Sequence, residues 1–268
     1  MVGVQAPWTR ESAPWPSGRP GPLTASGGRQ IGRQVLVEQR CRAAVARGGR
    51  RAEKIQHQGV VISFGSGRLS FAPLRNEIPI DVASNGPLGQ RSAGAVADAA
   101  IMEACGSVAE VAAFRSEVER CETAAGRAKG SVRLVARLNA CIADDGRRAR
   151  DIVRPTVARY LGRGSLRLAT AAAQGLTLPH EATAPLADAP YADGVTPYLP
   201  LLPLITDRHV DALTLAGTTE EVAAHVIELR RAGIGSIIIR PLAGDGVSTE
   251  DTIKAFGEIW PTILWAGG

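Results

Sequence analysis

The feature that most constrains the fold is an alternation of apolar runs and amphipathic segments, which begins near residue 59. The stretch VVISFGSGRLSFAP places two short β runs around Gly65-Ser66-Gly67 and predicts a hairpin. Apolar runs then predict strands over residues 78–83, 99–102, 131–144 and 236–241, with helical patterns between them. Repeated strand–helix alternation of this kind indicates right-handed βαβ units and a parallel sheet.

Capping residues define the predicted helices. Pro87 suits the first position of a helix, and Ser107 with Glu110 forms a capping-box pattern before the next one. Thr218 with Glu221 repeats that pattern. A last helix is predicted to begin at Ser248 and to turn three apolar side chains inward: Ile253, Phe256 and Ile259.

Two α/β folds agree with this pattern. One is an open, doubly wound sheet, and the other is part of an eight-stranded (β/α)₈ barrel. The continuous run SIIIRP is typical of a strand covered on both faces, which either fold would supply. Periodicity alone does not decide between them.

The first 56 residues differ in kind from the rest. They are rich in Arg, Gly, Pro and Ser. Their ten Lys/Arg and three Asp/Glu give this segment a net charge of +7, and since the whole chain has a net charge of +5, the remainder has −2. Such a segment buries too little apolar surface to offset its ordering entropy. We predict a disordered or aberrant leader over 1–56, from a misplaced start or shifted frame, and a folded unit over 57–268. A basic arm for nucleic acid is the third-ranked alternative.

Several protein classes lack support in the sequence. No apolar run approaches the roughly 18–20 residues of a membrane span, and no signal-peptide pattern opens the chain, so we expect a cytoplasmic location. The cysteines are far apart and lack a nearby histidine couple, which argues against a metal site. No Walker A, G-x-G-x-x-G or G-x-S-x-G motif is present.

One predicted strand end has the chemistry of an anion site. The turn Ser84-Asn85-Gly86-Pro87 joins a strand to a helix. Asn85 and Gly86 tolerate positive φ and would let the backbone turn sharply. The first N–H groups of the helix would then face an anion or phosphate. An ordinary βα turn is the alternative.

The next strand end lies at the same edge of a parallel sheet. Glu103 could hydrogen-bond a ligand or be a solvated carboxylate, and Gly106 follows it. Cys105 could be a nucleophile, but no histidine is placed to activate it, so a structural thiol is favoured. His225 falls in the middle of a predicted helix, where packing or surface roles are expected.

Three stretches together resemble the carboxyl-terminal half of the luciferase-like monooxygenase superfamily, over residues 59–263. They are RLSFAPLRNEIPIDVASNGPLGQRSAGAVADAAIMEACGS, VRLVARLNACIADDGRRARDIVRPTVARYL and LAGTTEEVAAHVIELRRAGIGSIIIRPL. The resemblance is nearest to deazaflavin-dependent, methylenetetrahydromethanopterin-reductase-like proteins. It implies a partial (β/α)₈ TIM barrel of about four βα units plus a β-hairpin.

The resemblance also implies function. Such proteins are oxidoreductases that use FMN or the deazaflavin coenzyme F420 for hydride transfer or monooxygenation of a small organic substrate. It implies cofactor binding by two groups of residues: Ala83, Ser84, Asn85 and Gly86, and Glu103, Ala104, Cys105 and Gly106. The chain departs from the family pattern at Ala99 and Ala104, where glycine is common.

The resemblance covers only half of a barrel, and no catalytic residue can be carried over. We therefore expect a truncated chain with little activity alone, which needs self-association or a partner to close. A non-catalytic cofactor-binding or assembly subunit is the alternative to the oxidoreductase.

Overall fold

The computed structural model describes residues 55–58, 63–67, 79–164 and 168–266. Its strands are β1 (Ile55–Gln58), β2 (Ser63–Gly67), β3 (Asp81–Ala83), β4 (Ala99–Glu103), β5 (Arg133–Ile142), β6 (Thr214–Gly217) and β7 (Ile234–Pro241). Its α-helices are α2 (Pro87–Val96), α3 (Val108–Ala124), α4 (Gly146–Arg163), α5 (His180–Thr183), α6 (Asp207–Leu213), α7 (Thr219–Arg231) and α8 (Thr249–Ala266). Short 3₁₀ helices are η1 (Ala184–Leu186), η2 (Tyr191–Asp193) and η3 (Thr196–Leu204).

A hairpin is present in this region, but it is not the one predicted around Gly65-Ser66-Gly67, whose second strand would lie outside the described residues. Strand β1 pairs antiparallel with β2, with Gln58 opposite Ser63. Gly65-Ser66-Gly67 therefore lies within β2, and the two strands are joined through residues 59–62. A Gly-Ser-Gly run is a weaker turn signal than Asn-Gly or Asp-Gly, because Gly and Ser also occur inside edge strands. The predicted leader falls, except for its last two residues, outside the described part of the chain.

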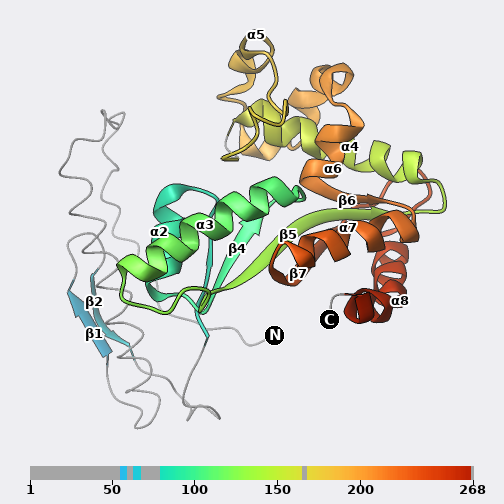
Figure 1. Ribbon diagram of the computed structural model, residues 1–268. Helices are drawn as coiled ribbons and strands as arrows, with labels where there is room; N and C mark the ends of the chain where they lie inside the picture. The colour runs from blue at the N-terminus through green and yellow to red at the C-terminus, as the bar shows by residue number, and fades with distance from the viewer. Residues whose placement is uncertain (1–54, 59–62, 68–78, 165–167, 267–268) are drawn as a thin grey trace.

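The main sheet has five parallel strands, and their order identifies the fold (Figure 1). β3 pairs with β4, β4 with β5, and β5 with β7 on its other edge. Apart from the short strand β6, each strand of this sheet therefore lies beside the strand that follows it in sequence. This is the strand order of a barrel segment. In a doubly wound sheet the strand order reverses at a switch point. The order excludes that alternative for the described strands.

Strand β6 fills a gap created by the stagger of the sheet. Glu103, the last residue of β4, is opposite Arg137, so half of β5 extends beyond β4. β6 pairs with Asn139–Ile142 in that stretch. Since β7 already pairs with Asn139 and Ala140, β6 must lie on the β4 side of β5. This four-residue strand was not predicted, because it is too short to show a period.

One hydrophobic core lies between the sheet and the helices α2, α3, α7 and α8. Alternate residues of β5 enter it, beginning with Leu134 and ending with Ile142. The alternation of the sequence predicts four apolar side chains on this face, and all four enter the core: Val132, Leu134, Leu138 and Ile142. The helices contribute Val111, Phe114, Val118, Val222, Val226, Leu229 and Ile263.

A second core lies on the other face of β5, at its carboxyl end. Cys141 contacts it from the strand, and α4 contributes a stripe of Ala149, Val153 and Val157 at helical spacing. Helices η3 and α6 complete the cluster. Figure 1 shows α4 and α6 on one side of β5 and α8 on the other. The second core covers only the end of this face and leaves the preceding residues of β5 outside it.

Most predicted helix boundaries are confirmed. Thr218 and Glu221 form the reciprocal capping box, and the Ser248 hydroxyl accepts from the Asp251 N–H at 3.0 Å. Ser107 also caps its helix, but the Glu110 carboxylate does not return to it. It instead accepts from the N–H groups of Ala169 and Thr170.

Three predictions about strands and faces were wrong. β3 begins at Asp81, later than the predicted residue 78, which itself lies outside the described residues. SIIIRP is not covered on both faces, because Ile238 is 42% exposed. Ile253 does not face inward and is 54% exposed, while Ile263 takes the buried position. An apolar residue thus does not by itself identify a covered face.

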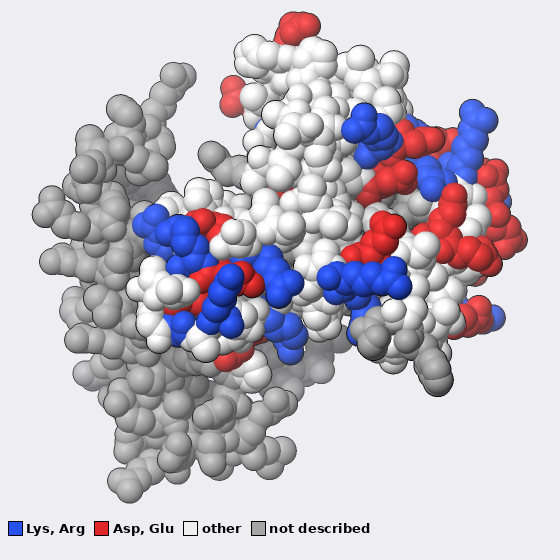
Figure 2. Space-filling view, viewed as in Figure 1, with Lys and Arg blue, Asp and Glu red and all other residues white. Residues whose placement is uncertain are grey.

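Charged side chains on the face shown in Figure 2 gather in two regions of mixed sign. One lies over α3, where Arg115 and Lys129 both pair with Glu119. The other lies around α4, where Arg150 pairs with Asp211 and Glu221. Neither region has the single-sign character of a nucleic-acid surface. The basic segment behind the nucleic-acid alternative lies outside the described residues.

The close approach of α2 and α3 yields a matched pair of predictions. A Cβ on Gly94 would lie 2.5 Å from the Cys121 Cβ, whereas a Cβ on Gly257 in α8 would meet nothing within 4 Å. Gly94→Ala should therefore destabilise by about 1–3 kcal/mol through overpacking. Gly257→Ala should stabilise by about 0.5–1 kcal/mol through helix propensity. Thermal denaturation of both variants checks this, and a stabilised Gly94→Ala protein would contradict it.

Candidate functional site

The structure brings the two predicted strand ends together through one side chain. Asn85 Oδ1 accepts from the Glu103 N–H at 2.7 Å, and Asn85 Nδ2 donates to the Glu103 carbonyl at 2.7 Å. The Ser84 N–H donates to the Ile101 carbonyl at 3.1 Å and continues the β3–β4 ladder. A side-chain amide with both a donor and an acceptor is the group that can bridge a backbone in this way. Ala83–Gly86 and Glu103 therefore form one rim.

The turn after β3 opens α2 with free donors. Gly86 is the N-cap and Pro87 the first helical residue, as predicted. The Ser84 hydroxyl accepts from the Gly86 N–H at 3.2 Å. The backbone N–H groups of Leu88 and Gly89 have no acceptor among the described residues. Unsatisfied N–H groups at a helix start, together with the helix dipole, favour an anion.

The predicted left-handed backbone in this turn was wrong. Gly86 has φ −81° and ψ 155°, an extended conformation, and Asn85 does not have positive φ either. The Asn85 side chain holds the turn by bonding Glu103, so no left-handed residue is needed. Close packing sets the glycine requirement elsewhere, because a Cβ on Gly89 would lie 2.0 Å from the Ser84 Cβ.

The turn after β4 contains the left-handed residue instead. Ala104 has φ +51°, and its N–H donates to the Arg137 carbonyl at 2.9 Å. This conformation costs a non-glycine residue about 1–2 kcal/mol, which explains in physical terms why glycine would suit the position. Gly106 donates its N–H to the Ala212 carbonyl at 2.8 Å. Both N–H groups are therefore already used.

Cys105 lies between them and is fully buried. Burial raises the pKa of its thiol well above the ordinary value, and the nearby Glu110 carboxylate raises the same pKa further. A thiol with a raised pKa is poorly nucleophilic near neutral pH. The geometry supports the interpretation of Cys105 as a structural residue.

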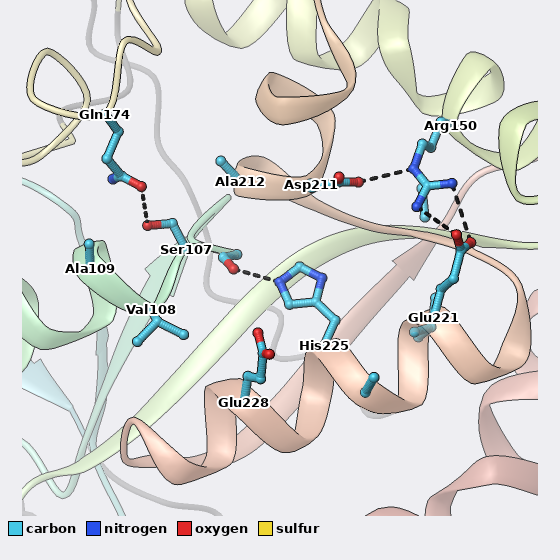
Figure 3. Close-up of a pocket in the computed structure, with 14 residues that line it drawn as sticks. Ser107, Val108, Ala109, Arg150, Gln174, Asp211, Ala212, Glu221, His225 and Glu228 are labelled. Atoms are coloured by element: carbon cyan, nitrogen blue, oxygen red, sulfur yellow. Dashed lines mark hydrogen bonds and ion pairs between the residues drawn. The ribbon is translucent and has the colours of Figure 1, made fainter.

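A cavity of about 580 Å³ lies behind this second turn, between α3, α6 and α7 (Figure 3). His225 Nε2 lies 2.6 Å from the Gly106 carbonyl oxygen, so its mid-helix position serves to hold the turn. Arg150 is bound by Asp211 at 3.1 Å and by both carboxylate oxygens of Glu221. Arg150, Asp211 and Glu221 are thus bonded to one another. From this side of the cavity, His225 supports the turn after β4.

A polar cluster that includes Tyr160 of α4 lies on the face of β5 opposite α2, α3, α7 and α8, and it was not predicted. Arg137 Nη1 is paired with Glu103 Oε1, and the Tyr160 hydroxyl donates to the same oxygen at 3.4 Å. Asn139 Nδ2 donates to the Tyr160 hydroxyl at 2.9 Å. Burial raises the pKa of Tyr160, and Glu103 raises it further. The available signal was the alternation of RLVARLNACI, which places Arg137 and Asn139 on one face of an otherwise apolar strand.

The described residues offer neither a metal site nor a membrane-spanning helix. No group of three or more His, Cys, Asp or Glu side chains there could hold a metal ion. No described helix has the length and apolar character that crossing a lipid bilayer requires.

Comparison with known proteins decides the family. Residues 40–236 match the luciferase-like monooxygenase family. The chain belongs to this family. No curated protein matches it significantly. The resemblance drawn from the sequence is therefore confirmed.

Solved structures show the same fold. Coenzyme F420-dependent tetrahydromethanopterin reductase from Methanopyrus kandleri is 19% identical, with a TM-score of 0.61 over 82% of this chain and 60% of its own. An F420-dependent secondary alcohol dehydrogenase in complex with an F420–acetone adduct is 15% identical, with a TM-score of 0.61 over 84% of this chain and 62% of its own. The chain thus spans about three fifths of the length of these two proteins.

The Asn85 bridge can be tested by its effect on the rim. Asn85→Ala should destabilise the protein by about 1–3 kcal/mol, because it leaves the Glu103 N–H without its acceptor. Amide hydrogen exchange at Glu103 should accelerate in this variant. The control is Gln90→Ala, which removes only a 3.2 Å bond to the Asn85 carbonyl. Unchanged exchange at Glu103 in Asn85→Ala would contradict the bridge.

Proposed function

We propose that the protein is a flavin- or deazaflavin-dependent oxidoreductase of the luciferase-like class. The observation that carries this proposal is the rim formed by Asn85, which joins two strand ends beside the free N–H groups of α2. In a parallel α/β fold, ligands bind at the carboxyl ends of the strands. The solved structures with the same fold that are named above use coenzyme F420.

The rim fits the phosphate of FMN or of coenzyme F420. The N–H groups of Leu88 and Gly89 are free among the described residues, and Ser84 adds a hydroxyl. Ala104 and Gly106 already donate to other carbonyls. In the proposal, Ala83–Gly86 and the start of α2 therefore hold the phosphate, while Glu103, Ala104, Cys105 and Gly106 form the wall beside the adjacent chain of the cofactor.

The bound cofactor would supply hydride transfer or oxygen activation on a small organic substrate. The chain's own residues would hold and orient it: the turn would fix the phosphate, and the face of β5 that carries Arg137 and Asn139 would border the reacting ring. The proposal includes little turnover by the chain on its own, because the described strands form only part of a barrel. It also includes a cytoplasmic location.

A phosphate-specific titration tests the cofactor site. FMN and riboflavin differ by the phosphate, and charge-assisted hydrogen bonds contribute about 1.5–3 kcal/mol each. FMN should therefore bind at least about tenfold more tightly than riboflavin, as followed by flavin fluorescence. Asn85→Ala should reduce that difference, and Gln90→Ala should retain it. Oxidised and reduced coenzyme F420 are titrated in parallel.

Two outcomes would contradict the cofactor site. One is equal affinity for FMN and riboflavin together with no binding of coenzyme F420. The other is an FMN preference that Asn85→Ala leaves unchanged, which would place the phosphate elsewhere.

We further propose that a second copy of the chain pairs with the sheet, as the assembly alternative requires. β3 and β7 lie at the two ends of the described sheet, and neither has a second neighbouring strand there. Open strand edges favour pairing with another chain. Sedimentation velocity should show a concentration-dependent dimer. A strictly monomeric protein that still binds the cofactor would contradict this assembly.

A further inference from the structure

The face of the sheet opposite α2, α3, α7 and α8 brings polar residues from three strands together. The register places Glu103 of β4 beside Arg137 of β5, and Arg137 beside Ile238 of β7. The next row on this face places Asn139 beside Arg240. Residues paired across neighbouring strands point to the same side of a sheet. These five side chains therefore share the face that α2, α3, α7 and α8 do not cover.

This face is accessible next to the proposed cofactor rim. Ile238 is 42% exposed, and the side chains of Arg137 and Glu103 are 37% and 45% exposed. α4 covers the following position of β5, Cys141, as part of the second core. The Asn85 bridge joins Glu103 to the start of α2. A small molecule on this face would thus lie beside the turn proposed to hold the phosphate.

The charges on this face do not balance. Glu103 is the one carboxylate in the group, and it is already paired with Arg137. Arg240 is exposed and forms no hydrogen bond or ion pair with any residue that the structure describes. Two guanidinium groups and one carboxylate leave an excess positive charge. A guanidinium offers a rigid fork of N–H donors that matches carboxylate and phosphate oxygens.

The two arginines are close enough to act on one group. Neighbouring parallel strands lie about 4.8 Å apart with a rise of about 3.3 Å per residue, so diagonal positions two residues apart are separated by about 8 Å. Arg137 and Arg240 occupy such positions. Both also act on the pKa of the Tyr160 hydroxyl, which they lower against the larger effect of burial. The Tyr160 hydroxyl therefore lies within electrostatic reach of both guanidinium groups.

A buried acceptor beside them has no partner. Asn139 is 3% exposed, and its Nδ2 donates to Tyr160. Its Oδ1 is buried without a hydrogen-bond partner among the described residues. Buried polar atoms are nearly always bonded, so an unpaired one calls for an explanation, such as a bound molecule. A ligand with a donor group would satisfy it.

We propose that Arg137 and Arg240 bind an anionic group, a carboxylate or a phosphate, on the small-molecule substrate. The inference rests on the proposed function where it calls this ligand a substrate. Asn139 accepts a hydrogen bond from the same molecule, and Ile238 contacts its apolar part. The substrate class is therefore a small organic acid or a phosphorylated compound.

The experiment uses succinate and inorganic phosphate as probes of the two anion types. Calorimetric titration of the full chain should show saturable binding of at least one probe, weakening as salt is added. Arg240→Gln should weaken it at least tenfold, while Arg240→Lys should retain part of the affinity. The matched control is Arg231→Gln, an exposed arginine on α7. Since Arg240 has no described partner, its removal leaves the fold intact.

The two proposals can fail separately. Phosphate binding that is lost in Asn85→Ala and unchanged in Arg240→Gln would place the anion at the α2 turn and overturn the inference, while supporting the cofactor site. Equal binding by wild type and Arg240→Gln, or no saturable binding of either probe, also overturns it. Failure of the FMN titration bears only on the proposed function.

Discussion

Strand β5 is the element on which the rest of the described fold depends. It pairs with β4, β6 and β7, and its two faces serve different purposes. One face is apolar from Leu134 to Ile142 and packs against four helices. The other presents Arg137 and Asn139 before it meets the second core at Cys141. The period of two in a strand thus separates the residues that stabilise this luciferase-like fold from those available for binding.

The Asn85 side chain is the second constraint, since it makes one rim from two strand ends. Without it, the turns after β3 and β4 would be joined only by the ladder below them. Behind the second turn, His225 and the Ala212 carbonyl hold Gly106 in place. The rim is thereby supported from both sides, as a binding site that must keep its geometry requires. The free N–H groups of α2 are the part of it left for a ligand.

The sequence predicted the elements better than it predicted their surroundings. The helix cap at Thr218 and the apolar face of β5 depend on local sequence, and both were predicted correctly. The exposure of Ile238 depends on which elements cover β7, which a local pattern does not contain. The pairing of Asn85 with Glu103 spans 18 residues, and the cluster around Tyr160 depends on the register of three strands. Such contacts follow from the tertiary fold.

If the start of α2 holds a cofactor phosphate, parallel titrations with FMN and riboflavin, followed by backbone amide chemical shifts, should distinguish the two flavins. FMN should move the amide signals of Asn85, Leu88 and Gly89, and riboflavin should leave them nearly unmoved. The amides of α8 serve as the internal reference. Identical shifts with both flavins, or FMN-specific shifts confined to other elements, would show that the start of α2 does not hold the phosphate.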